Sequence, residues 1–157
     1  MKSSGLGKTQ LTYGVLGIIG GLYLITAPFL FNYDGIKNAK GVKVDLSFVQ
    51  TSDIICGVLV VLLVGFALAT AAKESTLQLR KFAAYATIAV GVWLMFSPYF
   101  VDLMNNIFKA GFVSYIDISN PNFVDQGSGV LLVVLSGFAL LSLKGPVFTS
   151  KNYSYSA

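Results

Sequence analysis

The chain has 157 residues, of which 55% are hydrophobic and 11% charged, and its formal net charge is +4. Soluble domains carry about 25% charged residues, so this composition excludes an ordinary water-soluble domain and indicates a protein whose solvent is lipid. The chain has no histidine and a single cysteine, Cys56. It therefore lacks the commonest metal ligand and general base and cannot form an intrachain disulfide.

Four apolar runs follow one another along the chain, over residues 11–31, 54–72, 82–101 and 127–143. About 20 residues of α-helix cross a hydrocarbon core about 30 Å thick, and a backbone in lipid has to satisfy its own hydrogen bonds. The sequence therefore predicts an all-α membrane protein with four transmembrane helices. The first run is longer than the apolar part of a signal peptide and no clear cleavage site follows it, so we expect it to be retained.

The segments that connect the runs differ in length. Residues 73–81 form a short, charged link, whereas residues 32–53 and 102–126 form longer loops. Within the last loop, the alternation of apolar and polar residues over 111–119 is compatible with a short strand or with a stretch lying on the membrane surface.

The charges of these segments predict how the chain is oriented. The N-terminal segment, the short link and the C-terminal segment together hold seven Lys and Arg residues and one acidic residue. The two longer loops hold four lysines and six aspartates. The positive-inside rule then predicts a multi-pass protein of the cell membrane with both termini, including the tail 144–157, in the cytoplasm. This distribution accounts for the basic charge without a nucleic-acid partner.

The sequence repeats itself. The segment GLYLITAPF at 21–29 aligns with GVWLMFSPY at 91–99, 70 residues later. In the second run of each pair the spacing is 72 residues, which aligns Gly57 and Gly65 with Gly129 and Gly137. The chain therefore contains two copies of one helical hairpin.

We place repeat 1 at residues 11–72 and repeat 2 at residues 82–143, within a single domain of residues 1–157. Each repeat contains two spans, so both enter the membrane in the same orientation. This parallel-orientation pair of hairpins predicts a four-helix bundle with a pseudo-twofold axis along the membrane normal.

The segment around Ser97-Pro98-Tyr99, with Gly-Val-Trp-Leu before it, resembles the signature of the SPW-repeat proteins. These are small prokaryotic membrane proteins built from tandem two-helix units, each with a Ser-Pro-Trp-like motif near the end of its first helix. The first copy here reads Ala27-Pro28-Phe29, so neither copy has the tryptophan and the first also lacks the serine. The resemblance covers nearly the whole chain. It implies the two-hairpin architecture and brings no reaction with it.

The motif residues are the first candidate site. Proline near the end of a helix bends or ends it, and the aromatic residues around both motifs suit the membrane interface. The alternative is a paired pocket at the outer end of the bundle for a lipid or a quinone-like ring. The residues concerned are Ala27, Pro28, Phe29, Ser97, Pro98 and Tyr99.

Asp53 and Asp125 are the second candidate, because they precede the second and fourth apolar runs at equivalent positions. A carboxylate at a helix N-terminus accepts hydrogen bonds from free N–H groups and complements the helix dipole, so we expect helix capping. The alternative is a ligand or cation site, or a proton relay, formed by two carboxylates related by the twofold axis.

Small residues in the spans predict close helix packing, because they let helix backbones approach each other in lipid. Six glycines occupy such positions: Gly17, Gly21, Gly57, Gly65, Gly129 and Gly137.

The sequence contains no set of residues that supports catalysis, metal binding or a cofactor. We therefore expect a non-catalytic protein that contacts the lipid bilayer and other membrane protein subunits, as an accessory or structural subunit of a larger complex. The alternative is a small lipid- or ligand-binding or transport module with its site between the two repeats near the outer face.

Overall fold

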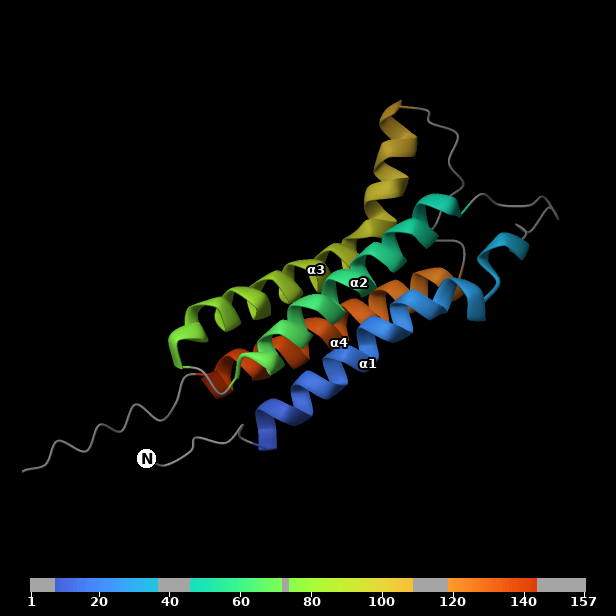
Figure 1. The fold of residues 1–157 in the computed structure, drawn as a ribbon. Helices are drawn as coiled ribbons and strands as arrows, with labels where there is room; N and C mark the ends of the chain where they lie inside the picture. The colour runs from blue at the N-terminus through green and yellow to red at the C-terminus, as the bar shows by residue number, and fades with distance from the viewer. Residues whose placement is uncertain (1–7, 37–45, 72–73, 109–118, 144–157) are drawn as a thin grey trace, which may run out of the picture.

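A computed structural model describes residues 8–36, 46–71, 74–108 and 119–143, and these form a bundle of long helices (Figure 1). The described elements include four long helices and two short 3-10 helices, which confirms the predicted all-α fold. In chain order they are α1 (Lys8–Leu30), η1 (Tyr33–Gly35), α2 (Ser47–Ala69), η2 (Glu74–Thr76), α3 (Leu77–Phe108) and α4 (Ser119–Leu143).

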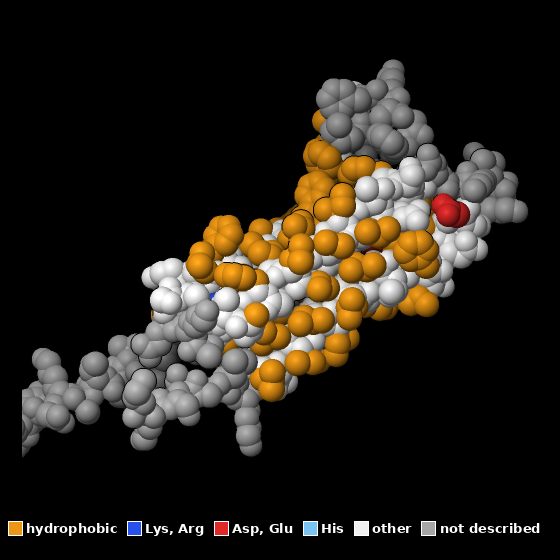
Figure 2. Space-filling model, viewed as in Figure 1, with side chains coloured by type: hydrophobic (Ala, Val, Ile, Leu, Met, Phe, Trp, Pro, Cys, Tyr) orange, Lys and Arg blue, Asp and Glu red, His pale blue; other side chains and the backbone are white. Residues whose placement is uncertain are grey.

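Four segments are long and apolar enough to cross a membrane, and each includes most of one long helix: Gln10–Gly35, Ser47–Ala69, Leu77–Phe100 and Phe123–Leu143. Large apolar side chains cover much of the face of the bundle that Figure 2 shows, and many large apolar side chains of the chain are at least half exposed, such as Leu62, Phe82 and Phe96. Water would penalise this surface, whereas hydrocarbon accepts it. The chain is thus a multi-pass membrane protein.

The helices pack as two hairpins. The most extensive contacts join α1 to α2 and α3 to α4, and smaller interfaces join α1 to α4 and α2 to α3. We call the end of the bundle where α1 and α3 begin the terminal end, and the opposite end the distal end (Figure 1). Because α1 and α3 begin at the same end, the hairpins share one orientation, as the repeat predicted.

The two repeats bury the same positions. Over residues 21–30 and 91–100 the sequence of buried, half-buried and exposed residues is identical position by position. Residues 51–60 and 123–132 differ in this respect only at Ser52 and Val124. The sequence repeat is therefore also a repeat of packing, with α1 equivalent to α3 and α2 equivalent to α4.

Within each hairpin the helices meet backbone to backbone. A Cβ on Gly57 would lie 2.6 Å from the carbonyl oxygen of Gly21, and one on Gly129 would lie 2.5 Å from that of Gly91. Side chains do not fit at such distances, so glycine is required at these crossings.

The helix boundaries differ from the predicted ones. Helices α2 and α4 begin at Ser47 and Ser119, several residues before the apolar runs, and α3 continues to Phe108. The first turns hold more polar residues than the runs that follow, so the apolar runs mark only part of each helix. Apart from Ser119, the segment 111–119 lies outside the described residues.

Pro98 does not end its helix, because α3 continues ten residues beyond it. The last turns of α3 point away from the bundle (Figure 1). A proline inside a helix removes one backbone hydrogen bond and bends the axis, which accounts for this change of direction. Pro28, by contrast, lies two residues from the end of α1, as expected.

Candidate functional site

Asp53 and Asp125 meet inside the bundle near its distal end. Each is the seventh residue of its helix, α2 or α4. Asp53 is 0% and Asp125 2% exposed, and their carboxyl groups lie close enough to interact with each other. The expectation that they cap helix N-termini is wrong, because both helices begin six residues earlier and the side chains turn into the core.

Each carboxyl group also accepts a hydrogen bond from a hydroxyl group, and the two hydroxyls come from non-equivalent positions. The Tyr33 hydroxyl donates to Asp53 Oδ2 at 3.2 Å, and the Ser97 hydroxyl donates to Asp125 Oδ2 at 3.3 Å. Ser97 is the serine of the second motif. Its equivalent in repeat 1 is Ala27, which has no hydroxyl group, so the hydroxyl group of Tyr33 donates to Asp53 instead.

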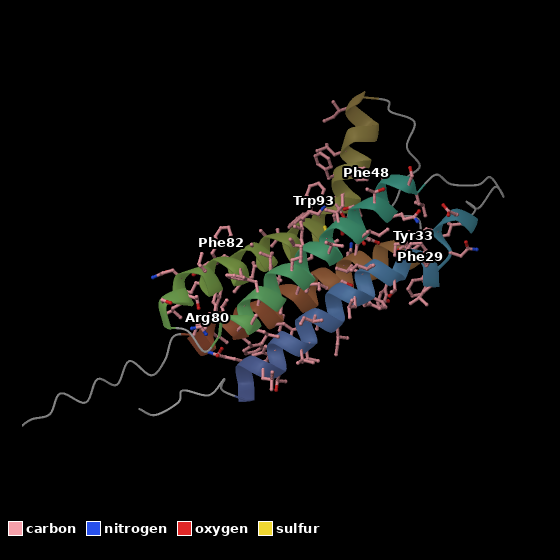
Figure 3. The ribbon with its side chains drawn as sticks, in the orientation of Figure 1. Phe29, Tyr33, Phe48, Arg80, Phe82 and Trp93 are labelled. Atoms are coloured by element: carbon pink, nitrogen blue, oxygen red, sulfur yellow. The ribbon has the colours of Figure 1, made fainter. Side chains whose placement is uncertain are left out.

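A turn after α1 positions Tyr33. Asn32 adopts the left-handed conformation at φ 47, which asparagine tolerates better than most residues. The chain then enters η1 and returns Tyr33 to the distal end of the bundle (Figure 3). There the tyrosine is buried with Leu46 and Val49, so its ring fills an apolar cluster while its hydroxyl reaches Asp53.

Beside its contact with Asp125, the Asp53 carboxyl has one oxygen, Oδ1, for which the described part of the chain provides no hydrogen-bond donor. A carboxylate only accepts hydrogen bonds, so two facing carboxylates repel each other unless they share a proton. The pair is therefore suited to hold one proton between the repeats.

The sequence pointed to the two carboxyl groups as equivalent residues, but placed them at helix N-termini and not in the core. Leu24, Leu94 and Ala27 pack around the axis with 0% exposure. The described residues also contain no group of three or more His, Cys, Asp or Glu side chains able to hold a metal ion. The carboxyl pair thus sits in a filled core.

The two motifs present their residues identically. Ala27 and Pro28 in α1, like Ser97 and Pro98 in α3, face the core. The third residue of each motif points outward, where Phe29 is 66% exposed and Tyr99 accepts a hydrogen bond from Gln126 Nε2 at 3.3 Å. Ser97 therefore has a specific structural role, because it donates a hydrogen bond to the Asp125 carboxyl group of the neighbouring helix.

The remaining candidate glycines fall into two kinds. Gly17 approaches Val64 of α2, 3.3 Å from the position of an added Cβ. A Cβ on Gly65 or Gly137 would meet no atom of the described chain within 4 Å. These two glycines occupy equivalent positions in α2 and α4, and the packing of the described bundle does not need them.

The two hairpins meet less closely than the helices within each hairpin. An apolar groove of about 500 Å³ runs between α2 and α3, past Cys56 and Ala89. An equivalent groove of about 320 Å³ runs between α1 and α4, past Gly20 and Ser128. Only the first is bridged by a tryptophan, since Trp93 Nε1 donates to the Ser52 hydroxyl at 3.2 Å.

A partly open cavity of about 70 Å³ lies between all four helices at the terminal end, opposite to the outer end for which the sequence suggested a pocket. Arg80 lines it and is only 8% exposed (Figure 3). Sequence reasoning did not single out Arg80. The available signal was its position in the repeat, because it is the equivalent of Gln10 and the only arginine among eleven basic residues.

Comparison with known proteins agrees with this architecture. No curated protein and no solved structure matches the chain. The family model of the SPW repeat domain matches residues 11–139, which include nearly all of both hairpins, both motifs and the Asp53–Asp125 pair. The chain therefore belongs to the SPW repeat family.

Proposed function

We propose that the protein is a non-catalytic subunit of a larger membrane assembly, and that it docks against a transmembrane helix of another protein through α2. The observation that carries this proposal is the open position of Gly65, where an added Cβ would meet nothing within 4 Å.

A helical glycine without a packing role is unfavourable. Glycine in a helix interior costs about 0.5–1 kcal/mol relative to alanine. Its advantage in lipid is that it lets a second backbone come close. Gly65 lies four residues before Ala69, so both small residues fall on one face of α2. Gly137 lies four residues before Leu141, which is 61% exposed, so the α4 face is less suited to close approach.

The polar side chains in the spans support a structural role. The hydroxyls of Thr26, Thr70 and Thr87 donate to carbonyl oxygens of their own helices, and those of Tyr33 and Ser97 serve the carboxyl pair. These groups are used to satisfy the bundle itself, which favours a structural subunit over an enzyme.

Position-specific crosslinking tests the proposed face. A photo-crosslinking amino acid is placed at Leu62 or Phe66, which flank Gly65 on α2, and at Leu22 on α1 as the control, since all three side chains are exposed to lipid. We expect one defined protein adduct in native membranes from Leu62 or Phe66 and none from Leu22.

A substitution at the same face provides the second arm. Gly65→Leu has room within the chain and is expected to keep the protein folded while abolishing the adduct. Val58→Leu, on a lipid-exposed position of the same helix, is the matched control. Adducts that form equally from all three sites, or that survive Gly65→Leu, would contradict the proposal.

A further inference from the structure

We propose that the cavity at the terminal end binds the oxyanion head of an amphiphile, with the Arg80 guanidinium as its partner. The ligand class is a carboxylate or phosphate carried on an apolar chain. The site is separate from the Gly65 face and does not depend on the docking role proposed above.

Arg80 is a buried cation with an unsatisfied nitrogen within the described part of the chain. It is 92% buried, and Nε has no hydrogen-bond acceptor in the part of the chain that the structure describes. An arginine near a membrane surface ordinarily extends its long side chain to the headgroups and water. Arg80 instead turns inward and lines the cavity (Figure 3). A buried charge costs several kcal/mol unless something pairs with it.

The local helix geometry increases the need for an anion. Arg80 is the fourth residue of α3, so its positive charge lies in the first turn, beside the positive end of the helix dipole. Cations are unfavourable there, and helix N-termini favour anions. The guanidinium and the helix end therefore attract the same ligand.

Arg80 differs in its hydrogen bonding from the equivalent residue of repeat 1. Its equivalent, Gln10, donates from Nε2 to the carbonyl oxygen of Ser142 at the end of α4, at 3.5 Å. The symmetric acceptor for Arg80 would be the carbonyl oxygen of Thr70 just after α2, and the hydroxyl found on that oxygen is that of Thr76, which donates to it at 2.9 Å. Arg80 is thus released from the role that its position has in repeat 1.

The walls of the cavity indicate the rest of the ligand. Beyond Arg80 they are mainly apolar, with Val64, Ala83 and Leu132 among the lining residues. Thr87, two helical turns and about 10 Å from Arg80, lies at the deep side. A volume of about 70 Å³ exceeds the room needed for one water about five-fold. It accommodates an oxyanion head with the first carbons of its chain. Arginine pairs with carboxylate and phosphate through two parallel hydrogen bonds.

Thermal unfolding of the full chain in a neutral detergent, followed by the fluorescence of Trp93, tests the proposal with octanoate as the probe. Octanol, which has the same chain and no charge, is the control ligand. A second arm compares phosphatidylglycerol with phosphatidylcholine discs, which separates a lipid headgroup from a free carboxylate as the source of the oxyanion. A ligand that binds the folded state raises Tm.

We expect octanoate, phosphatidylglycerol or both to raise Tm by about 3 °C or more, and octanol to have no such effect. Arg80→Gln, which introduces the residue that repeat 1 carries at this position, should abolish the rise. Lys81→Gln removes the adjacent cation and should keep it. An equal rise in Arg80→Gln, or no rise with either anion, would overturn the proposal.

A measurement on the unaltered protein covers the case in which Arg80→Gln does not fold. Arg80 is the only arginine, so modification by phenylglyoxal, located by mass spectrometry of the peptide that contains Arg80, reports on this side chain. Octanoate or phosphatidylglycerol should slow the modification at least about threefold, and octanol should not. Equal rates under all conditions would exclude the site.

Discussion

Asp53 and Asp125, which hold the same position in the two repeats, contact each other in the core of the bundle, yet they receive their hydroxyl hydrogen bonds from different places. The Tyr33 hydroxyl donates to Asp53, and the Ser97 hydroxyl donates to Asp125. The two hairpins therefore share the buried carboxyl group and differ in the hydroxyl group that donates a hydrogen bond to it.

Removing the motif serine should weaken the bundle. Ser97→Ala leaves a buried oxygen of Asp125 with one donor fewer, and a lost hydrogen bond to a buried polar group costs about 1–3 kcal/mol. Thr26→Ala is the control, because the exposed Thr26 hydroxyl bonds only to its own helix backbone. Unfolding in mixed micelles with increasing dodecyl sulfate should show a clear loss of stability for the first variant and little change for the second. Equal losses would argue against a special role for Ser97.

The first repeat should accept the serine that it lacks. Tyr33→Phe is expected to cost about 1–3 kcal/mol, because it removes the donor to Asp53 and keeps the ring. Adding Ala27→Ser to Tyr33→Phe places a hydroxyl where Ser97 lies in repeat 2 and should restore at least half of the loss. The double-mutant cycle measures this coupling directly. Additive effects of the two substitutions would show that the two hydroxyl positions are not interchangeable.

Replacing one carboxyl group of the pair by an amide should be tolerated. Asp53→Asn has nearly the same shape and supplies an N–H donor to the facing Asp125 carboxyl, so it relieves the repulsion between two acceptors. We expect the stability near neutral pH to stay within about 1 kcal/mol of the parent or to rise. Asp53→Ala, which leaves a cavity and strands the Tyr33 hydroxyl, should cost about 2 kcal/mol or more. A larger loss for the amide than for alanine would show that the charge of Asp53 is needed.

The glycines at the helix crossings should respond unlike those on the surface. Gly129→Ala forces a methyl group against the carbonyl oxygen of Gly91 and the Met95 side chain. Overpacking of this kind costs about 1–3 kcal/mol. Gly137→Ala meets open space and should stabilise the isolated protein by about 0.5–1 kcal/mol through helix propensity alone. The sign of the difference in unfolding free energy distinguishes the two positions, and a loss at Gly137 would reveal a contact within the chain.

The predicted orientation can be checked by cysteine labelling. Cys56→Ser should be neutral, since the equivalent residue is Ser128 and both side chains are buried. In that background, single cysteines at Ser3 and Ser154 are expected to react from the cytoplasmic side, and one at Asn38 from the opposite side. Four spans require both chain ends on one side, and the lysine distribution chooses which. Reaction of the two terminal cysteines from different sides would exclude four membrane crossings.

The architecture could be read from the sequence because its determinants are local. Four apolar runs and a repeat with an even number of spans leave only parallel hairpins, and glycine at equivalent places in paired helices predicts their close crossing. Gly57 and Gly129 meet Gly21 and Gly91 in this way, whereas an added Cβ on Gly65 or Gly137, which are matched equally well, would meet no atom of the described chain within 4 Å.

The candidate site could be predicted only in part, because its determinants depend on the three-dimensional arrangement. Hydropathy places Asp53 at the edge of an apolar run, although α2 begins six residues earlier and carries it into the core. Tyr33 reaches that core only because Asn32 reverses the chain in a left-handed conformation. Arg80 looked like one more cation of a basic link, since nothing in the sequence says whether an arginine points inward or outward.

The different hydroxyl donors also bear on how the protein is assembled. A chain made from its N-terminus completes the α1–α2 hairpin before α4 exists, and for that interval Asp53 has no second carboxyl group beside it. Tyr33 belongs to the same hairpin as Asp53 and is already present at this stage. The first hairpin can therefore form the hydrogen bond to the Asp53 carboxyl group by itself while that group lies in lipid. When α4 packs later, it closes the bundle around an Asp53 carboxyl group that already accepts one hydrogen bond. The Asp125 carboxyl group of α4 accepts its hydrogen bond from Ser97 of α3, the helix made immediately before it.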